Sequence, residues 1–423
     1  MLSFGGGIDG IGVSSQVPEV FLVVYGSQWG TAGTDSKGNM TLSGDTVGAV
    51  PYLESLFKGL GTGGELWSGT FTQYCDGPGV PIGATVCPTN LSSSSLNFIQ
   101  YPGGYAFAGI WYDNSGPSPA SATAAQLAQE AINAAGHFGR NYDALNRYAQ
   151  YIILSPPGTT PDGFNTSSGN FCAWHDYNTD AGVSSPYGDI AFINMPYVYD
   201  AGSNCGVAAV NTGAQGNLDG FSIVAGHEYA ETITDQNPAG GWTNKQGGAH
   251  NGQENGDECA WITTGAQEAT QNVVMGTGTF AMQSTWSNDT NDCNISHPVL
   301  VFNQPPPPEQ PPPPPPPQPG TVLINGKSVK GLAEATVDSG KLYSIVVPSG
   351  KSSLVIKTSG TVGDDDIYVA RGYKPTDSSF DKYSDNYGDN ESITYKSPKA
   401  GTYYILVEAY QAFSGVTLVA TFK

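Results

Sequence analysis

Basic side chains are scarce in the first three quarters of this chain. The stretch 321–423 contains eleven basic and eleven acidic residues, so the net charge of −21 lies entirely in residues 1–320. Nucleic-acid binding requires a basic footprint, and anionic membranes attract clusters of lysine and arginine. The composition therefore excludes both classes of partner. Residues 1–320 contain only five basic side chains, which are Lys37, Lys58, Arg140, Arg147 and Lys245.

Long apolar runs are also missing, since a transmembrane helix needs about 20 consecutive apolar residues. Residues 1–36 contain no lysine or arginine, so the start of the chain lacks the charged segment of a secretory signal peptide. Only 13% of the residues are charged, a composition that is typical of secreted proteins. We expect a secreted, extracellular monomer that does not insert into a membrane, and no signal peptide in this chain.

The six cysteines include no Cys-x-x-Cys pair, which excludes a zinc knuckle and a thioredoxin-type site. All of them precede residue 294, and their number fits an oxidising compartment. Six cysteines allow many connectivities. The simplest prediction joins sequential neighbours as disulfides, namely Cys75–Cys87, Cys172–Cys205 and Cys259–Cys293.

One short segment carries most of the chemical information. Residues 226–231 read Gly-His-Glu-Tyr-Ala-Glu, and on a helix His227 and Glu231 share one face while Glu228 takes the next position. This is the zinc-peptidase helix His-Glu-x-x-His with its second histidine replaced by glutamate. One imidazole and one carboxylate can hold a divalent metal, and Glu228 can act as the base that activates water. The alternative is an ordinary helix ion pair.

Candidates for a third metal ligand follow this segment. A helix-stop sequence at 234–238 leads into a glycine-rich loop that ends in Glu254-Asn-Gly-Asp257. The arrangement resembles thermolysin-like zinc peptidases, in which a glutamate after the helix is the third ligand and an acidic residue lies close behind it. The resemblance implies Glu254 and Asp257 as that pair, and either can be the ligand. Asp235 and His250 are further candidates, which a helix end and a surface loop also explain.

A histidine upstream is a second candidate catalytic residue. His175 closes the segment Cys172-Ala-Trp-His, before the metal helix. It can stabilise an oxyanion, or it is a packed loop histidine held by a nearby disulfide. The order of motifs over 170–261 resembles a family of secreted proteins, and part of it is similar to the plant Exordium proteins, which lack the His–Glu pair.

Residues 1–302 mix apolar strands with helices. Continuous apolar runs predict buried strands at 20–25, 151–154 and 190–193, and helical periodicity marks 51–60 and 122–137. We expect an α/β or α+β layered catalytic domain, and the resemblance to zinc peptidases implies a zincin-like fold. Twelve prolines within 303–320 predict a semi-rigid polyproline linker of roughly 45 Å.

Residues 321–423 alternate apolar and polar side chains in short stretches at 322–324, 342–347, 353–356, 366–369, 402–407 and 416–421. This pattern predicts an all-β sandwich. The segments Gly363-Asp-Asp-Asp-Ile-Tyr-Val369 and Gly401-Thr-Tyr-Tyr-Ile-Leu-Val407 resemble the bacterial pre-peptidase C-terminal domain. That resemblance implies a jelly-roll-like domain appended to a secreted peptidase.

Three consecutive carboxylates precede one of these strands. Asp364, Asp365 and Asp366 can bind Ca²⁺ through oxygen ligands, and similar domains in clostridial collagenases carry such a site. We predict Asp364 and Asp366 as the calcium ligands. An acidic turn that begins the strand is the alternative.

Together these features predict a secreted zinc endopeptidase that hydrolyses extracellular proteins or peptides, with Zn²⁺ as cofactor and Ca²⁺ as a second candidate ion. The alternative is a non-catalytic extracellular protein that binds cell-wall glycan, since its many aromatic side chains can stack on sugars.

Overall fold

The computed structural model describes residues 1–88, 96–301, 321–337, 339–348, 350–360, 362–371, 374–376, 380–388 and 390–423. The chain divides into two compact units, Met1–Pro308 and Glu309–Lys423. The predicted proline linker at 303–320 lies outside the described residues. Within the described ranges, none of the helices is both long enough and apolar enough to cross a membrane.

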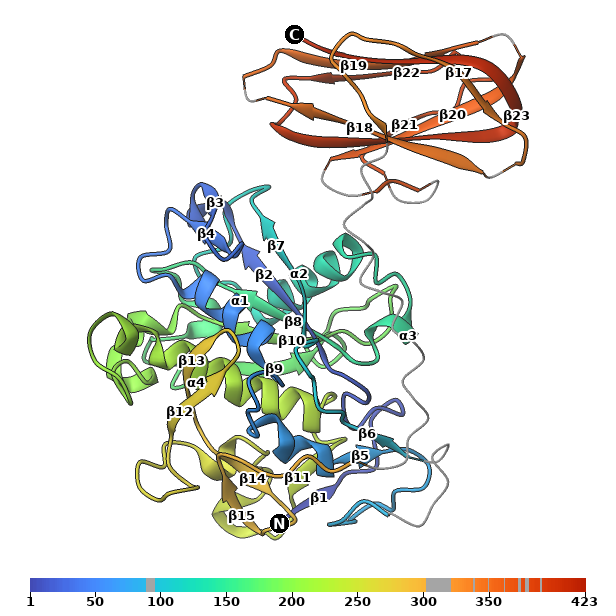
Figure 1. Ribbon diagram of the computed structural model, residues 1–423. Coiled ribbons are helices and arrows are strands. Elements are labelled where there is room, and N and C mark those ends of the chain that lie inside the picture. The colour runs from blue at the N-terminus through green and yellow to red at the C-terminus, as the bar shows by residue number, and fades with distance from the viewer. Residues whose placement is uncertain are drawn as a thin grey trace. The chain divides into compact units, whose positions relative to one another are not determined.

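A five-stranded sheet of order β7–β2–β8–β10–β9 forms the centre of the N-terminal unit (Figure 1). The first four strands run parallel, and β9 lies antiparallel to β10 at the edge. Continuous apolar runs suit these parallel strands because both faces of the sheet are covered. The bounds are β2 (Glu19–Tyr25), β7 (Phe107–Asp113), β8 (Ala149–Leu154), β9 (Trp174–Tyr177) and β10 (Ala191–Met195).

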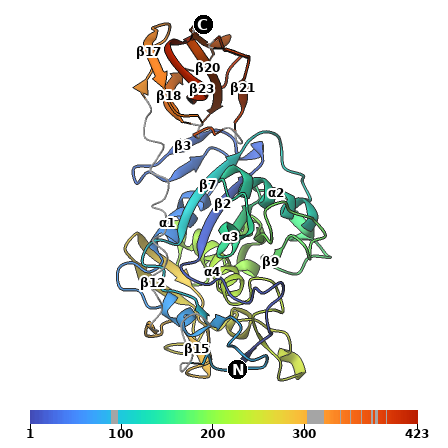
Figure 2. The same ribbon diagram turned by 90° about the vertical axis from the view of Figure 1, so that its right-hand side faces the viewer.

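Helices cover both faces of this sheet (Figure 2). Helix α2 (Ala124–His137) packs on one face, where its alanines and Leu127 contact Phe21 and Tyr151. Helices α1 (Ala49–Gly59) and α4 (Gly213–Thr234) pack on the opposite face. The N-terminal unit is therefore a three-layer α/β structure with two hydrophobic cores.

Helix α4 carries the His-Glu-x-x-Glu segment. It starts after Thr212, well before the apolar run, and it ends where Asp235 leaves helical backbone angles. The residues from Asp219 to Thr234 are almost all buried, because the helix lies between the sheet and β13. A helix that is enclosed in this way presents its polar side chains to an interior site rather than to bulk solvent.

Short elements complete the N-terminal unit. Its six cysteines are paired as the disulfides Cys75–Cys87, Cys172–Cys205 and Cys259–Cys293, which confirms disulfide bonding. The remaining elements are β1 (Leu2–Phe4), η1 (Ser27–Trp29), β3 (Ala32–Thr34), β4 (Met40–Leu42), η2 (Ser68–Gln73), β5 (Cys75–Asp76), β6 (Asn97–Phe98), α3 (Asp143–Asn146), η4 (Pro161–Gly163), η5 (Val198–Cys205), β11 (Trp242–Asn244), η6 (Gly248–His250), η7 (Asp257–Cys259), β12 (Gln271–Met275), β13 (Gly278–Met282), β14 (Thr285–Ser287) and β15 (Asp292–Asn294).

The C-terminal unit is all-β, with two layers around its own core. Its strands are β16 (Thr321–Val322), β17 (Val329–Glu334), β18 (Gly340–Val347), β19 (Ser353–Ser359), β20 (Val362–Arg371), β21 (Lys382–Ser384), β22 (Ser392–Lys396) and β23 (Gly401–Phe422).

The prediction of separate strands at 402–407 and 416–421 is wrong, because β23 runs unbroken through both. Its first half pairs with β18 and β20 in one layer, and its second half pairs with β17 and β19 in the other. The strands β17, β21 and β22 were not predicted. β21 has only three residues, and the pairing of β17 with β23 is irregular.

Candidate metal centre

One turn of α4 presents three polar side chains to the same region. His227 Nε2 lies 3.0 Å from Glu231 Oε1, as the spacing of four residues requires. Glu228 is buried beside them, and one of its oxygens, Oε2, has no hydrogen-bond partner among the residues that the structure describes. A buried carboxylate oxygen without a partner is costly, and a bound cation would satisfy it.

The loop after α4 brings two more carboxylates to the helix. Asp257 lies at the start of η7, and its backbone N–H donates to Glu231 Oε1 at 3.0 Å. Gly256 permits this approach, because a Cβ at position 256 would lie only 2.9 Å from the His227 ring and 3.0 Å from Glu231 Oε1. The disulfide Cys259–Cys293 fixes the end of the same loop.

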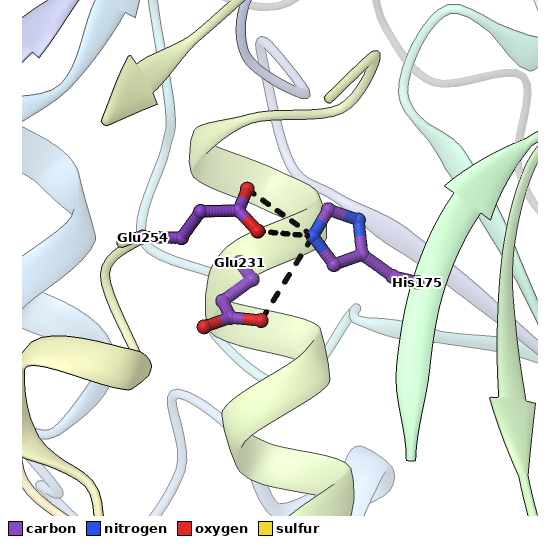
Figure 3. Close-up of side chains that lie close together, drawn as sticks. All are labelled: His175, Glu231 and Glu254. Atoms are coloured by element: carbon purple, nitrogen blue, oxygen red, sulfur yellow. Dashed lines mark hydrogen bonds and ion pairs between the residues drawn. The ribbon is translucent and has the colours of Figure 1, made fainter. Parts of the chain in front are cut away.

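The edge strand β9 supplies the second histidine. His175 pairs with Ile193 of β10, while its neighbour Trp174 packs on Phe192 toward α2. Because side chains alternate along a strand, His175 points toward α4 instead. Its Nε2 lies 3.1 Å and 3.2 Å from the two oxygens of Glu254 and 3.9 Å from Glu231 Oε2 (Figure 3). His175 is therefore a strand residue rather than a loop residue, and it lies among carboxylates.

These residues form two groups of potential metal ligands that share Glu231. We call His227, Glu231 and Asp257 the outer triad, and His175, Glu231 and Glu254 the inner triad. Within each triad one ligand atom per residue lies within 4.8 Å of the others. The sequence left Glu254 and Asp257 as alternatives for one ligand position, whereas the structure places them in different triads.

Gln283, which the sequence did not point to, orients the outer histidine. Its Oε1 lies 3.1 Å from His227 Nδ1, and its side-chain amide donates to the carbonyl oxygen of Gly256 at 2.8 Å. If Nδ1 carries the hydrogen, the lone pair of Nε2 faces Glu231 and Asp257. Such a contact fixes the tautomer of a metal-binding histidine. Gln283 follows β13 in the sequence, and no motif marks it.

Burial and mutual repulsion shift the protonation of this cluster. Burial raises the pKa of Glu228 to about 8. Burial also raises the pKa of Glu254 well above its usual value, and the charge of Glu231 adds to this shift. Burial opposes the charge on Glu231 too, but the neighbouring His227 outweighs it and lowers the pKa of Glu231. A cluster with this excess of buried carboxylates needs protons or cations for compensation.

A cavity of about 560 Å³ opens onto the outer triad. His227, Glu228 and Asp257 line it, together with Gln283 and Trp261, whose side chain is half exposed. The side chains of the inner triad do not contribute to this wall. A molecule in the cavity therefore meets the outer triad and Glu228 first.

The other sequence candidates lie elsewhere. Asp235 is fully buried and accepts hydrogen bonds from the backbone N–H groups of Ala239 and Gly241. Burial raises the pKa of Asp235 well above its usual value, and the charge of Glu254 and a hydrogen bond to it add to this shift. Asp235 therefore contacts Glu254 but does not belong to either group of potential ligands. His250 is 65% exposed and contacts Gln253 and Glu258 outside the cluster.

The predicted calcium ligands belong to the C-terminal unit. Asp364 accepts a hydrogen bond from the Gly388 N–H at 2.8 Å. Burial raises the pKa of Asp366 to about 6, and the charges of Asp364 and Asp385 add to this shift. In the described part of the chain these carboxylates do not form a group as tight as the two triads. Calcium binding stays a prediction.

The donor set of the N-terminal cluster fits a divalent metal. Imidazole nitrogen and carboxylate oxygen are both zinc ligands, and two histidines and three carboxylates converge here. Among the described residues, Oε2 of the neighbouring Glu228 has no hydrogen-bond partner. Exposed acidic groups often gather without an ion, but these groups are mostly buried and include imidazole.

Comparison with known proteins identifies part of the C-terminal unit. Residues 340–409 match the profile of the bacterial pre-peptidase C-terminal domain. The protein therefore has more than one domain, and its C-terminal domain is of this all-β type.

Similar proteins match over this same region. The "Neutral protease" of Vibrio proteolyticus is 38% identical over 101 residues, which cover 24% of this chain and 16% of that protein. The "Extracellular protease" of Xanthomonas campestris is 44% identical over 100 residues, covering 24% and 17%. The "Zinc metalloprotease" of Helicobacter pylori is 35% identical over 99 residues, covering 23% and 38%. This chain thus spans well under half the length of each relative.

Solved structures match the same share of the chain. A structure titled "Solution structure of vEP C-ter 100" is 36% identical, covers 24% of this chain and 97% of its own, and has a TM-score of 0.21. The pre-peptidase C-terminal domain of a Bacillus anthracis collagenase is 17% identical, covers 24% and 93%, and has a TM-score of 0.20.

Proposed function

We propose that this protein is a secreted, zinc-dependent endopeptidase whose active site lies within residues 1–302. The observation that carries this proposal is the convergence of two histidines and three carboxylates, with His227, Asp257 and the buried Glu228 at the wall of a cavity. The residues come from an edge strand, a helix and a loop. The disulfide Cys172–Cys205 lies close to the strand, and Cys259–Cys293 fixes the end of the loop. A zincin-like fold for this domain is part of the proposal.

The outer triad would hold the zinc ion, because His227 and Asp257 line the cavity that a substrate would enter. A zinc ion at this position supplies a Lewis acid that polarises a peptide carbonyl and lowers the pKa of water. Gln283 directs Nε2 of His227 toward this position, and Gly256 lets Asp257 approach the helix.

Glu228 is the proposed general base. Glu228 lines the cavity and is otherwise buried, and one of its carboxylate oxygens has no protein partner in the described structure. Burial raises its pKa to about 8, and a neighbouring cation favours the ionised form. The carboxylate can then accept a proton from the attacking water and deliver it to the amine that leaves.

The relatives support the class of reaction. They are named as neutral, extracellular and zinc proteases and share the C-terminal domain with this chain. We infer from this that the substrate is an extracellular protein or peptide. Since the shared region excludes the cluster, the catalytic assignment rests on the geometry of the N-terminal unit.

The direct test is the substitution Glu228→Gln, assayed on casein after loading with zinc. Loss of a general base lowers the rate by about 100- to 10,000-fold, while zinc content should match the wild-type protein. Glu268→Gln, a glutamate outside the cluster, is the matched control and should retain activity. Full activity of Glu228→Gln would refute the mechanism, and absence of hydrolysis by the zinc-loaded wild-type protein would favour the non-catalytic glycan-binding alternative.

A further inference from the structure

The two triads differ in what surrounds them but meet at one residue. Glu231 directs Oε1 toward His227, at 3.0 Å, and Oε2 toward His175, at 3.9 Å. A carboxylate whose two oxygens face two separate sets of ligands has the arrangement of a bridging ligand. We propose that Glu231 bridges two divalent metal ions, one in the outer triad and one in the inner triad.

This inference rests on the proposed function for the role of the outer ion, and it adds a second ion that the motif on α4 does not predict. The inner ion would bind His175 Nε2, Glu231 Oε2 and Glu254. His175 is then a metal ligand, and neither the oxyanion-stabilising residue nor the packed loop histidine that the sequence offered as alternatives. Glu254 and Asp257 likewise serve one ion each.

Distances within the triads suit ligands of a common ion. Two atoms that each lie about 2.1 Å from a tetrahedral zinc are roughly 3.4 Å apart. The inner triad has His175 Nε2 at 3.1 Å from Glu254 and 3.9 Å from Glu231. The outer triad has His227 Nε2 at 3.0 Å from Glu231 and 3.7 Å from Asp257. The two triads are thus equally well arranged, and a single ion would leave one of them empty.

Charge compensation also favours two ions. Three carboxylates of the two triads face only two histidines, which are neutral when they bind metal, and Glu228 lies beside them at the cavity. When these four carboxylates are ionised, one divalent ion leaves two negative charges in a largely buried site, whereas two ions compensate all four. The excess matters because an uncompensated buried charge is strongly unfavourable. Asp235 lies outside this count, since two backbone N–H groups already bind it.

The two proposed ions differ in how far their ligands are exposed to solvent. The side chains of His175, Glu231 and Glu254 are 3%, 5% and 17% exposed, whereas those of His227 and Asp257 are 17% and 43% exposed. His227 and Asp257 line the cavity, whereas His175 and Glu254 do not. We expect the outer ion to leave quickly when a chelator is added and the inner ion to leave slowly.

The test measures metal content in the full-length protein after saturation with zinc and removal of free ion. The wild-type protein should hold two equivalents and release them to a chelator in two phases. His175→Ala should hold one equivalent and lose the slow phase, and Asp257→Asn should hold one and lose the fast phase. His250→Ala, whose histidine lies outside the cluster, should hold two.

Manganese gives a measurement that needs no variant. Ions in two-metal sites lie about 3.5–4 Å apart, so the saturated wild-type protein should show the exchange-coupled EPR spectrum of an ion pair. A spectrum of isolated ions, or a single equivalent of zinc at saturation, would overturn the proposal. Metal content does not depend on turnover: an inactive protein with two ions would refute the proposed function alone, and an active one with a single ion would refute the bridging role alone.

Discussion

The two units of this protein differ in what makes them recognisable, which is sequence similarity for the C-terminal unit and side-chain geometry for the N-terminal unit. The C-terminal unit matches a known domain profile over residues 340–409, yet its carboxylates do not converge into a tight metal-binding group in its described part. The N-terminal unit contains both triads, the three disulfides and the large cavity. Sequence similarity therefore identifies the C-terminal domain, whereas the proposal of catalysis rests on the geometry of the N-terminal unit.

The difference has a physical basis in how each unit is built. The β-sandwich is specified by alternating side chains and turns that lie close together in sequence, so its pattern is legible in short segments. The candidate site joins residues 175, 227–231, 254–257 and 283, which only the folded sheet and loop bring together. The sequence indicates His227, Glu231, Glu254 and Asp257, but the place of His175 among them and the division into two triads depend on the arrangement of β9 beside α4.

The largest effect should come from a methyl group placed inside the cluster. In Gly256→Ala the new Cβ would lie 2.9 Å from the His227 ring, so the loop must move away and Asp257 with it. We expect loss of the outer ion and of nearly all hydrolysis, measured by zinc content and casein cleavage. Gly116→Ala is the control, because a Cβ there meets no atom within 4 Å. Normal zinc content in Gly256→Ala would show that the loop does not need this close approach.

Reduction of the disulfides should lower the stability of the N-terminal unit but not that of the C-terminal unit. Cys172 lies three residues before His175, and Cys259 lies two residues after Asp257, so two of the disulfides brace the ligand-bearing segments. Loss of one disulfide costs roughly 2–5 kcal/mol. Dithiothreitol should lower the melting temperature of the N-terminal unit and release its metal, while the transition of the cysteine-free C-terminal unit stays in place. Equal shifts of both transitions would argue that the units do not fold separately.

A smaller effect is expected from Gln283, which contacts His227 and the Gly256 carbonyl oxygen. Removal of such an orienting contact weakens metal binding by about 10- to 100-fold. Gln283→Ala should therefore bind zinc more weakly in a competition titration with a chelator, while Gln246→Ala, an exposed glutamine, should bind as the wild type does. If the two variants have the same affinity, Gln283 does not orient the ligand.

The smallest effect concerns stability far from the cluster. Burial raises the pKa of Glu130 on α2 to about 8, from 4.5. The folded protein then binds this proton more tightly than the unfolded chain, so the contribution of Glu130 to stability is present below about pH 4.5 and is lost as pH rises toward 8. Glu130→Gln should melt several degrees higher than the wild type at pH 8 and at a similar temperature at pH 4. If the difference in melting temperature between the two proteins were the same at pH 4 and at pH 8, the raised pKa of Glu130 would be contradicted.

Features that depend on neighbouring residues could be predicted from the sequence, whereas features that depend on contacts between distant segments could not. Apolar runs located β2, β8 and β10, and the four-residue spacing placed His227 and Glu231 on one helix face. The role of His175 required knowledge that Trp174 points toward α2, which depends on the register of β9 against β10. Gln283 was not predicted, because it belongs to no recognisable sequence motif. β23 was predicted as two strands, because Ser414 and Gly415 resemble a turn at the point where this strand passes between layers.

The central claim is that the N-terminal unit alone carries a metal-dependent peptidase site. The most direct measurement compares residues 1–302 with the full chain on a short soluble peptide, with and without a chelator. The account predicts equal rates for the two proteins, abolished by the chelator and restored by zinc. Hydrolysis that persists in chelator, or a zinc-loaded and folded 1–302 that cleaves no peptide while the full chain does, would contradict it.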